Sequence, residues 1–199
     1  MLHFPELNRG KCKTYLVACE RTRKALLIDP VRDHISRYLA FLAYHQLRLD
    51  AIVDTHTHAD HPTGSFQLHD LTQSRLIMHR RAPAPGVDEH VEQGDRIALG
   101  ELVVQVLYTP GHTPDSISLY AGDRVFTGDV LLIGGTGRAD FAGGDAGQQY
   151  DSITRKLFAL PEETLVFPAH DYRGNHCSTI ECEKRQNPRI AGRTRQQYI

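Results

Sequence analysis

Short apolar runs and helical patterns alternate along the first half of the chain. Residues 14–18 and 25–28 are mainly apolar, and each run predicts a strand. Apolar side chains then recur at i, i+3, i+4, i+7 and i+8, which predicts a helix with Asp33 as its cap. The apolar residues of this helix are Ile35, Tyr38, Leu39, Leu42 and Ala43. Residues 49–54 predict a third strand, which leads directly into a polar segment.

The second half continues this alternation. In residues 101–108, apolar side chains occur at both even and odd positions, so both faces of the predicted strand carry apolar residues and we expect both faces to be buried. Residues 82–94 are polar and predict a loop. The other expected elements are a short helix that ends near residue 71, strands at 76–78, 117–120, 125–126 and 165–167, a glycine-rich loop at 134–147, a helix at 150–160 and a last helix from about Ser178. No internal repeat or low-complexity linker interrupts the pattern, so we expect one α/β domain over residues 1–199.

Composition and charge limit the partners. The chain has 199 residues, 40% hydrophobic and 24% charged, which is enough to bury a core without disulfides. The net charge is −1, and basic residues are spread out apart from an arginine-rich stretch at 184–195, so no nucleic-acid partner is expected. No signal-peptide pattern opens the sequence, and no run approaches the ~20 apolar residues of a membrane span. We therefore expect a cytoplasmic protein with a small-molecule partner and no membrane contact.

The four cysteines show no metal-binding pattern. Cys12, Cys19, Cys177 and Cys182 form no CxxC pair and no regular framework. We interpret them as buried or idle thiols.

The highest density of potential metal ligands lies at residues 56–61, which have the sequence HTHADH and follow the predicted strand at 49–54. Three further predicted strands also end in ligand-type side chains. Because strand ends meet at one edge of a layered α/β fold, we expect these side chains to form one cluster, with enough ligands for one metal ion or two. The candidate ligands are His56, His58, Asp60, His61, His112, Asp129 and His170.

The order of HTHADH, TPGHT, FTGD and PAH resembles the metallo-β-lactamase superfamily. This resemblance implies a four-layer αββα sandwich with metal ions at the edge of the two sheets. In the hydrolases of the superfamily, a metal-bound hydroxide forms at two sites bridged by the residue that matches Asp129. The first site matches His56, His58 and His112, and the second matches Asp60, His61 and His170.

Two further segments are similar to the persulfide dioxygenases, also called sulfur dioxygenases. They are LLIGGTGRADF at 131–141 and FPAHDYRG at 167–174, followed by ST at 178–179 and NPR at 187–189. The resemblance implies one Fe(II) per chain, held by His56, His112 and Asp129, with open positions for the substrate sulfur, dioxygen and water. The substrate would be glutathione persulfide or a similar low-molecular-weight thiol persulfide, oxidised with O2 and water to sulfite and thiol. His58, Asp60, His61 and His170 would then either hold a second metal ion or form hydrogen bonds within the site.

The same resemblance suggests substrate-binding residues. Arg138 offers a planar fork for a glutathione carboxylate, and Tyr172 offers a hydroxyl group beside the site. Thr136 stands where many relatives have a cysteine, so a thiol-based role does not carry over to that position. The family often forms dimers, and a homodimer is compatible with this interpretation.

The main alternative is a dinuclear zinc thioester hydrolase of the glyoxalase II, or hydroxyacylglutathione hydrolase, type. It shares all seven ligand-type residues and would bind two zinc ions per chain. Length argues against it, because that family usually adds a helical region after the last ligand, whereas 29 residues follow His170 here. A secreted β-lactamase would need an export signal. A non-catalytic metal sensor is disfavoured because the ligand set is complete.

Overall fold

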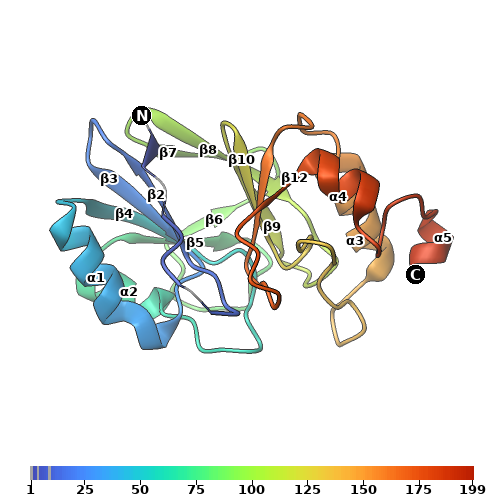
Figure 1. The fold of residues 1–199 in the computed structure, drawn as a ribbon. Coiled ribbons are helices and arrows are strands. Elements are labelled where there is room, and N and C mark those ends of the chain that lie inside the picture. Colours follow the sequence, from blue (N-terminus) through green and yellow to red (C-terminus); the bar gives the residue numbers. More distant parts are fainter. Residues whose placement is uncertain (1, 4, 9) are drawn as a thin grey trace.

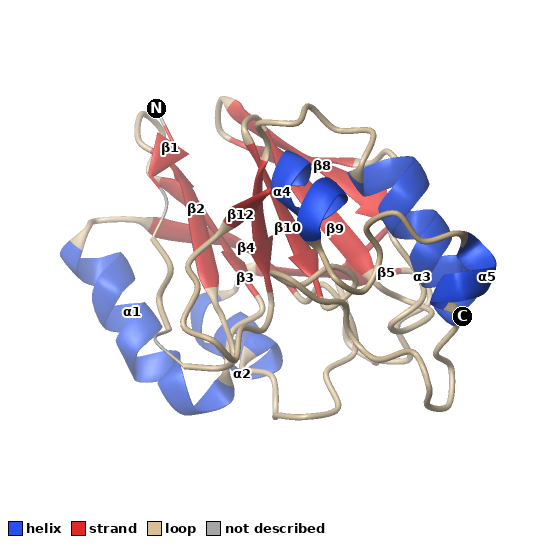
Figure 2. Cartoon of the chain, turned by 45° about the vertical axis from the view of Figure 1, so that its right-hand side comes forward, coloured by secondary structure: helices blue, strands red, loops and turns tan. Residues whose placement is uncertain are grey.

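Two β-sheets face each other and carry helices on their outer sides (Figures 1 and 2). The computed structural model describes residues 2–3, 5–8 and 10–199. Within these residues the first sheet has the order β1-β2-β3-β4-β5-β6, and the second has the order β12-β11-β10-β9-β8-β7. The strands of the first sheet are β1 (Leu2–His3), β2 (Tyr15–Cys19), β3 (Lys24–Ile28), β4 (Arg48–Val53), β5 (Arg75–His79) and β6 (Glu89–Val91). Those of the second are β7 (Arg96–Leu99), β8 (Leu102–Tyr108), β9 (Ile117–Ala121), β10 (Arg124–Gly128), β11 (Leu165–Pro168) and β12 (Ser178–Thr179).

Both sheets are mixed. In the first sheet β1, β2 and β3 pair antiparallel, whereas β3, β4, β5 and β6 run parallel to one another. In the second sheet only β10 and β11 pair in parallel among the described strands. Parallel neighbours end at the same edge of a sheet, so the loops after β3, β4 and β5, and those after β10 and β11, gather on one rim.

Helices lie against the outer face of each sheet. The helices and helical turns are η1 (Arg32–His34), α1 (Ile35–Tyr44), α2 (Ser65–Thr72), α3 (Ala146–Ser152), η2 (Ile153–Leu157), α4 (Ile180–Gln186) and α5 (Arg195–Tyr198). Figure 1 shows α1 and α2 beside the first sheet and α3, α4 and α5 beside the second. No helix in the described part of the chain is long and apolar enough to cross a membrane.

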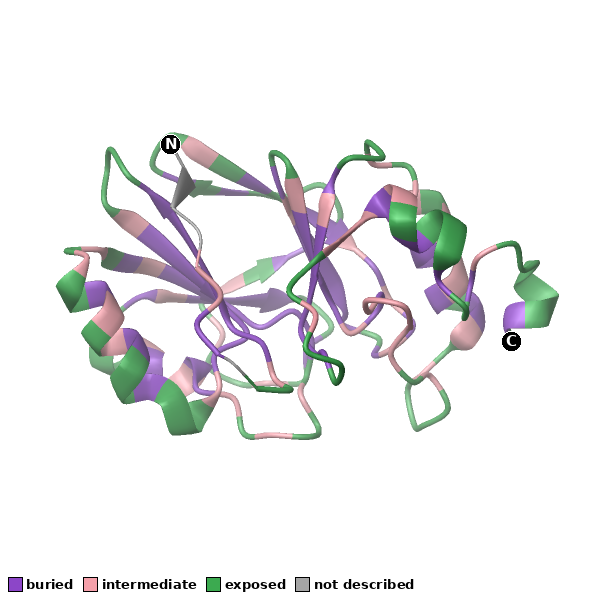
Figure 3. Cartoon of the chain, viewed as in Figure 1, coloured by how far each residue is buried: buried purple, intermediate pink, exposed green. Residues whose placement is uncertain are grey.

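Three apolar clusters hold the layers together, and the alternation of each strand decides which cluster a side chain joins. In β2, Tyr15 and Val17 belong to the cluster between the two sheets, and Leu16 belongs to the cluster beneath α1. A third cluster joins the second sheet to the helices that follow it, with Val125 and Ile153 as members. Because the central strands are buried on both faces (Figure 3), their sequences are continuously apolar. The four-layer αββα arrangement expected from the sequence is confirmed.

Three local predictions are wrong. Asp33 does not cap α1, because it lies within the 3-10 turn Arg32–His34 and His34 occupies the cap position without a side-chain hydrogen bond. The segment 82–94 is not wholly a loop, because β6 pairs in parallel with β5 from Glu89 to Val91. The helix expected at 150–160 begins earlier, at Ala146, where Asp145 accepts a hydrogen bond from the Gln148 amide.

The strand β8 is buried on both faces only toward its end. Val103, near its start, is 42% exposed, whereas Leu107 packs with the helices that cover the second sheet. The prediction from the apolar alternation is therefore half wrong, because the helices do not cover the outer face where β8 pairs with β7.

Candidate metal centre

Four strand ends deliver ligand-type side chains to one rim. His56 follows β4, His112 follows β8, Asp129 follows β10 directly, and His170 follows β11. The turn into Asp129 requires a glycine, because Gly128 has a φ of 53° and a Cβ there would lie 2.7 Å from the Thr55 hydroxyl oxygen. The residues expected to cluster do lie together, but they form three separate groups of candidate ligands within the described residues.

The first group consists of His56, His112 and Asp129. The Nε2 atom of His56 is 3.7 Å from Oδ2 of Asp129, and Nε2 of His112 is 3.5 Å from the same oxygen. The two imidazole rings stand nearly perpendicular, at 82°. These separations are too long for hydrogen bonds, but two ligand atoms about 2.1 Å from one ion lie roughly 3 to 3.5 Å apart. The three atoms therefore have the spacing of ligands that face a common cation.

The hydrogen bonds at Nδ1 of His56 and of His112 fix the tautomers of these two side chains. His112 Nδ1 lies 2.7 Å from the carbonyl oxygen of Arg138, which can only accept, so this nitrogen carries the proton. His56 Nδ1 lies 2.9 Å from the Thr55 hydroxyl, which gives its own proton to Asp29 and so accepts from His56. Both Nε2 lone pairs are consequently free and directed at Asp129. This is the arrangement that orients histidines toward a metal.

The protonation of the first group also suits a cation. Burial, and after it the charge of His58, lower the pKa of His56 to about 3, so His56 is neutral. Burial alone would raise the pKa of Asp129, but the hydrogen bond from His170 and the nearby histidines hold it well below its usual range. A neutral imidazole and an ionised carboxylate are the forms that bind metals, so the residues present fit a divalent metal ion.

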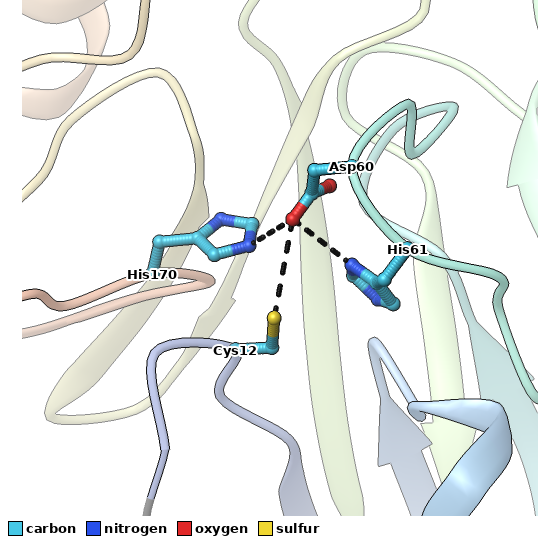
Figure 4. A group of neighbouring side chains, drawn as sticks. All are labelled: Cys12, Asp60, His61 and His170. Atoms are coloured by element: carbon cyan, nitrogen blue, oxygen red, sulfur yellow. Dashed lines mark hydrogen bonds and ion pairs between the residues drawn. The ribbon is translucent and has the colours of Figure 1, made fainter.

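The second group consists of Cys12, Asp60, His61 and His170 (Figure 4). His170 connects it to the first group, because its Nδ1 is 2.6 Å from Asp129 Oδ1 and its Nε2 is 2.8 Å from Asp60 Oδ2. Burial opposes the charged form of His170, but the hydrogen bond to Asp129 and the charges of both carboxylates raise its pKa. Both ring nitrogens of His61 are buried and have no hydrogen-bond partner among the described residues. Nδ1 of His61 does lie 3.2 Å from Asp60, within ion-pair distance but without hydrogen-bond geometry.

Cys12 is the member of this group that the sequence did not predict. The sequence identified it as an idle thiol, yet its Sγ lies 3.9 Å from Asp60 Oδ2. Burial and the carboxylates of Asp60 and Asp129 raise the pKa of this thiol. The sequence contains no local signal for this placement of Cys12, because Cys12 reaches the site through an antiparallel bridge to His170, which is distant in the sequence.

The third group consists of Asp29, Asp54 and His58. The Nε2 atom of His58 is 3.2 Å from Asp29 Oδ1 and 4.0 Å from Asp54 Oδ1. Burial would lower the pKa of His58, but the hydrogen bond and charge of Asp29, together with Asp54, raise it to about 9. Asp29 itself has a left-handed φ of 50° and also accepts the Thr55 amide at 2.7 Å. His58 is thus an imidazolium ion whose Nε2 is bound to a buried acid. Its ring lies 4.2 Å from that of His56 between centroids, and its buried Nδ1 has no hydrogen-bond partner among the described residues.

A cavity of about 950 Å³ opens above the first group. Such a volume is within the range of small-molecule sites. Arg138 and Tyr172, the expected substrate-binding residues, both line it, and so does Arg81, which the sequence did not indicate. Arg138 is 77% exposed and binds Asp140 through two of its nitrogens, at 2.9 and 3.2 Å. Tyr172 is 65% exposed and its ring stacks over His170 at 6.0 Å between centroids.

Comparison with known proteins decides the family. The family model described as the metallo-β-lactamase superfamily matches residues 7–170. The mitochondrial persulfide dioxygenase ETHE1 of Homo sapiens is 41% identical over 179 residues, which are 89% of this chain and 70% of the human protein. The crystal structure of ETHE1 from Myxococcus xanthus has a TM-score of 0.95 and 48% identity, and the match covers 100% of this chain and 88% of that one. The chain belongs to the persulfide dioxygenase family of the metallo-β-lactamase superfamily.

Hydrolases of the superfamily are less similar. A hydroxyacylglutathione hydrolase from a Polaromonas species is 38% identical over 168 residues, which cover 81% of this chain and 63% of the hydrolase. The expectation that the chain belongs with the persulfide dioxygenases is confirmed. Membership in this family implies a metal site, and the groups described above supply candidate ligands for it.

Proposed function

We propose that the chain is a mononuclear Fe(II) persulfide dioxygenase that acts on glutathione persulfide or a similar low-molecular-weight thiol persulfide. The observation that carries this proposal is the convergence of His56 Nε2, His112 Nε2 and Asp129 Oδ2, while Nε2 of His58 is bound to Asp29. Two imidazoles and one carboxylate on one face are the ligand set of non-haem iron oxygenases. Membership in the persulfide dioxygenase family supports the same assignment.

The proposed reaction consumes one thiol persulfide, one O2 and one water. The sulfur–sulfur bond breaks, the thiol retains one sulfur, and the terminal sulfur leaves as sulfite with three oxygen atoms and the release of two protons. Iron bound by the first group would supply the binding of sulfur and the activation of dioxygen that protein side chains cannot. His56, His112 and Asp129 together occupy one face, which leaves the cavity side open to substrate.

The residues around the ligands hold protons and charge in place. His170 lies between Asp129 and Asp60 and donates a hydrogen bond to each carboxylate. One Asp129 oxygen is therefore occupied, and the other faces Nε2 of His56 and Nε2 of His112. Asp60 is 49% exposed, so the pair that it forms with His170 connects the buried ligands to solvent. Apolar side chains of the cavity, including Phe141 and Leu132, limit the water that reaches the reacting sulfur.

Arg138 and Tyr172 are proposed to bind the thiol carrier. The remaining nitrogen of the Arg138 guanidinium is available for a glutathione carboxylate beside Asp140. Replacing Arg138 by Ala should raise KM for glutathione persulfide about tenfold and change kcat much less, because a contact to the carrier is made equally in the ground and transition states. Arg21→Ala is the matched control, since Arg21 is also exposed and paired with a carboxylate but does not line the cavity. An unchanged KM in Arg138→Ala removes this assignment.

The first experiment is metal analysis of anaerobically purified protein, paired with oxygen uptake and sulfite release on addition of glutathione persulfide. One iron per chain, with one O2 consumed per sulfite formed, is the expected result. Two zinc ions per chain without oxygen uptake would overturn the proposal and indicate thioester hydrolysis instead, because the hydrolases of the superfamily use the same seven ligand-type residues.

A further inference from the structure

Two arginines line the cavity above the first group, and they come from different sheets. Arg81 follows β5 of the first sheet, and Arg138 follows β10 of the second. Among the described residues, no other arginine or lysine lines this cavity. A molecule bound in the cavity can therefore contact one guanidinium group from the loops of each sheet. The proposed function uses Arg138, whereas Arg81 is a charged group of the cavity without an assigned role.

Arg81 and Arg138 differ in their partners. Arg138 already binds Asp140 through two of its nitrogens. Arg81 forms no ion pair with a carboxylate of the described chain, whereas its neighbour Arg80 pairs with Glu92 at 2.6 Å and does not line the cavity. A guanidinium group presents five N–H donors in a planar fork that matches a carboxylate. The whole fork of Arg81 is consequently available for an anion that enters the cavity.

The ring of Tyr108 holds Arg81 in place. The guanidinium carbon of Arg81 lies 5.6 Å from the centre of this ring. His79 stacks on the same ring at 4.2 Å with 3° between the planes, and the Tyr108 hydroxyl donates to the carbonyl oxygen of Pro114 at 2.8 Å. The backbone amide of Arg81 also donates to Nδ1 of His79 at 3.2 Å. A guanidinium group that rests on a fixed ring loses less conformational freedom when it binds an anion.

The acids of the cavity restrict where a bound carboxylate can lie. Asp129 belongs to the first group and Asp60 to the second, and both line the cavity. Asp115 lines it as well, and its Oδ2 accepts the amide and the hydroxyl of Thr57 at 2.8 and 2.7 Å. Like charges repel, so a ligand whose thiol faces the first group should direct its carboxylates away from these acids and toward the two arginines.

We propose that Arg81 and Arg138 bind two separate carboxylates of one thiol carrier, so that Arg81 makes the site selective for carriers with two carboxylates. This inference rests on the proposed function and names the substrate class more closely. Glutathione carries a glycine carboxylate and a γ-glutamyl carboxylate, whereas cysteine carries one carboxylate. The cavity volume of about 950 Å³ is large enough for a tripeptide. Both contacts are remote from the reacting sulfur, so they should lower KM rather than raise kcat.

The test measures binding of three thiols to iron-loaded protein by anaerobic titration calorimetry. The thiols are glutathione, its glycine amide, which lacks only the glycine carboxylate, and 4-aminobutanoyl-cysteinylglycine, which lacks only the γ-glutamyl carboxylate. All three share the same thiol, so differences in Kd report the carboxylates. Arg81→Gln should bind glutathione about tenfold more weakly than the wild type does. For the one analogue that lacks the carboxylate facing Arg81, the same substitution should change Kd less than about twofold.

Arg80→Gln is the matched control, because it removes the same charge at the adjacent position outside the cavity. It should bind all three thiols as the wild type does. An unchanged Kd for glutathione in Arg81→Gln, an equal loss for all three thiols, or the same loss in Arg80→Gln would each overturn the proposal. A further arm needs no variant: the wild-type protein should bind both analogues more weakly than glutathione, and equal binding of either analogue would show that the two carboxylates are not held together.

Turnover provides a separate readout. Arg81→Gln should lower kcat/KM for glutathione persulfide about tenfold relative to that for cysteine persulfide, with kcat nearly unchanged. An unchanged ratio of the two kcat/KM values would contradict the role of Arg81. The calorimetry requires neither dioxygen nor oxidation of a persulfide, so a protein that recognises both carboxylates but releases no sulfite would refute the dioxygenase assignment and leave the role of Arg81 intact.

Discussion

Gly137 lies against the two ligands His112 and Asp129, and the replacement Gly137→Ala tests how closely the first group is supported. A Cβ at this position would lie 2.0 Å from the carbonyl oxygen of Asp129 and 3.0 Å from Nδ1 of His112. Ordinary contact begins at about 3.4 Å, so the two backbone segments must separate by about 1.4 Å. The carbonyl of the next residue, Arg138, fixes the tautomer of His112 and would move with them.

The expected effect can be estimated from these contacts. Separation breaks the hydrogen bond from the Gly137 amide to the Asp129 carbonyl, now 2.9 Å, and weakens the 2.7 Å bond that orients His112. Loss of a group that orients a ligating histidine lowers metal affinity by about 10- to 100-fold. A displacement of about 1 Å also costs about 100-fold in rate. We therefore expect Gly137→Ala to bind Fe(II) about 10- to 100-fold more weakly and to lose about 100-fold in kcat/KM.

The assay is a competition titration of Fe(II) against a chelator, with persulfide-dependent oxygen uptake measured at saturating iron. Gly135→Ala is the matched control, because a Cβ there meets only Leu132 at 3.9 Å in the same loop. Gly135→Ala should resemble the wild type in both measurements. If Gly137→Ala bound iron and consumed oxygen as Gly135→Ala does, the inferred support of His112 and Asp129 by this segment would be wrong.

Two further predictions concern stability. Tyr198→Phe removes the hydroxyl that donates to the buried Gln149 at 2.9 Å, so it should lower the free energy of unfolding by about 1–2 kcal/mol and Tm by about 2–8 °C; an unchanged melting curve would refute this role. Asp50 is mostly buried, and although burial raises its pKa, hydrogen bonds and charges of neighbouring cations lower it overall. A depressed pKa means that this stabilisation is complete above the unfolded pKa of about 3.9 and is lost as pH falls through the lower pKa of the folded state. Urea titrations should therefore show Asp50→Asn about 1–2 kcal/mol less stable at pH 7, with the gap to the wild type narrowing as the pH falls below about 4, whereas a constant gap would contradict the assignment. The cations are Lys24, Arg48 and Arg75.

The central strands could be predicted because burial on both faces is written into their sequences. The strand β3 reads KALLI, and four of its five residues are buried, so the apolar run and the strand nearly coincide. The strand β6 has three residues, only Val91 of which is buried, so no alternation is visible. Such short edge strands are stabilised by pairing with a longer neighbour, here β5, and that contact has no local signal.

The site could be predicted where ligands sit on strand ends, and not where their partners come from elsewhere in the chain. His112 and Asp129 each follow a recognisable strand, so their meeting follows from topology. Cys12 and Asp60 are 48 residues apart, and the bridge that brings Cys12 to His170 involves a single residue on each side. Spacing rules applied to the four cysteines alone cannot find a contact of that kind, because the side chains grouped with Cys12 are two histidines and a carboxylate.

The seven motif residues are common to hydrolases and dioxygenases, so what separates the two must lie in the groups that hold each imidazole. His58 has the type and the spacing of a metal ligand, but Asp29 binds its Nε2, and a buried carboxylate cannot lose this cation without a large free-energy penalty. For His58 to join the first group through its buried Nδ1, which has no hydrogen-bond partner among the described residues, the ring would have to lose a proton that Asp29 and Asp54 stabilise. Asp29 therefore opposes a third imidazole ligand in the first group, and in the proposed function it is this buried acid, rather than the number of histidines in the motif, that keeps the ligand set at two imidazoles and one carboxylate.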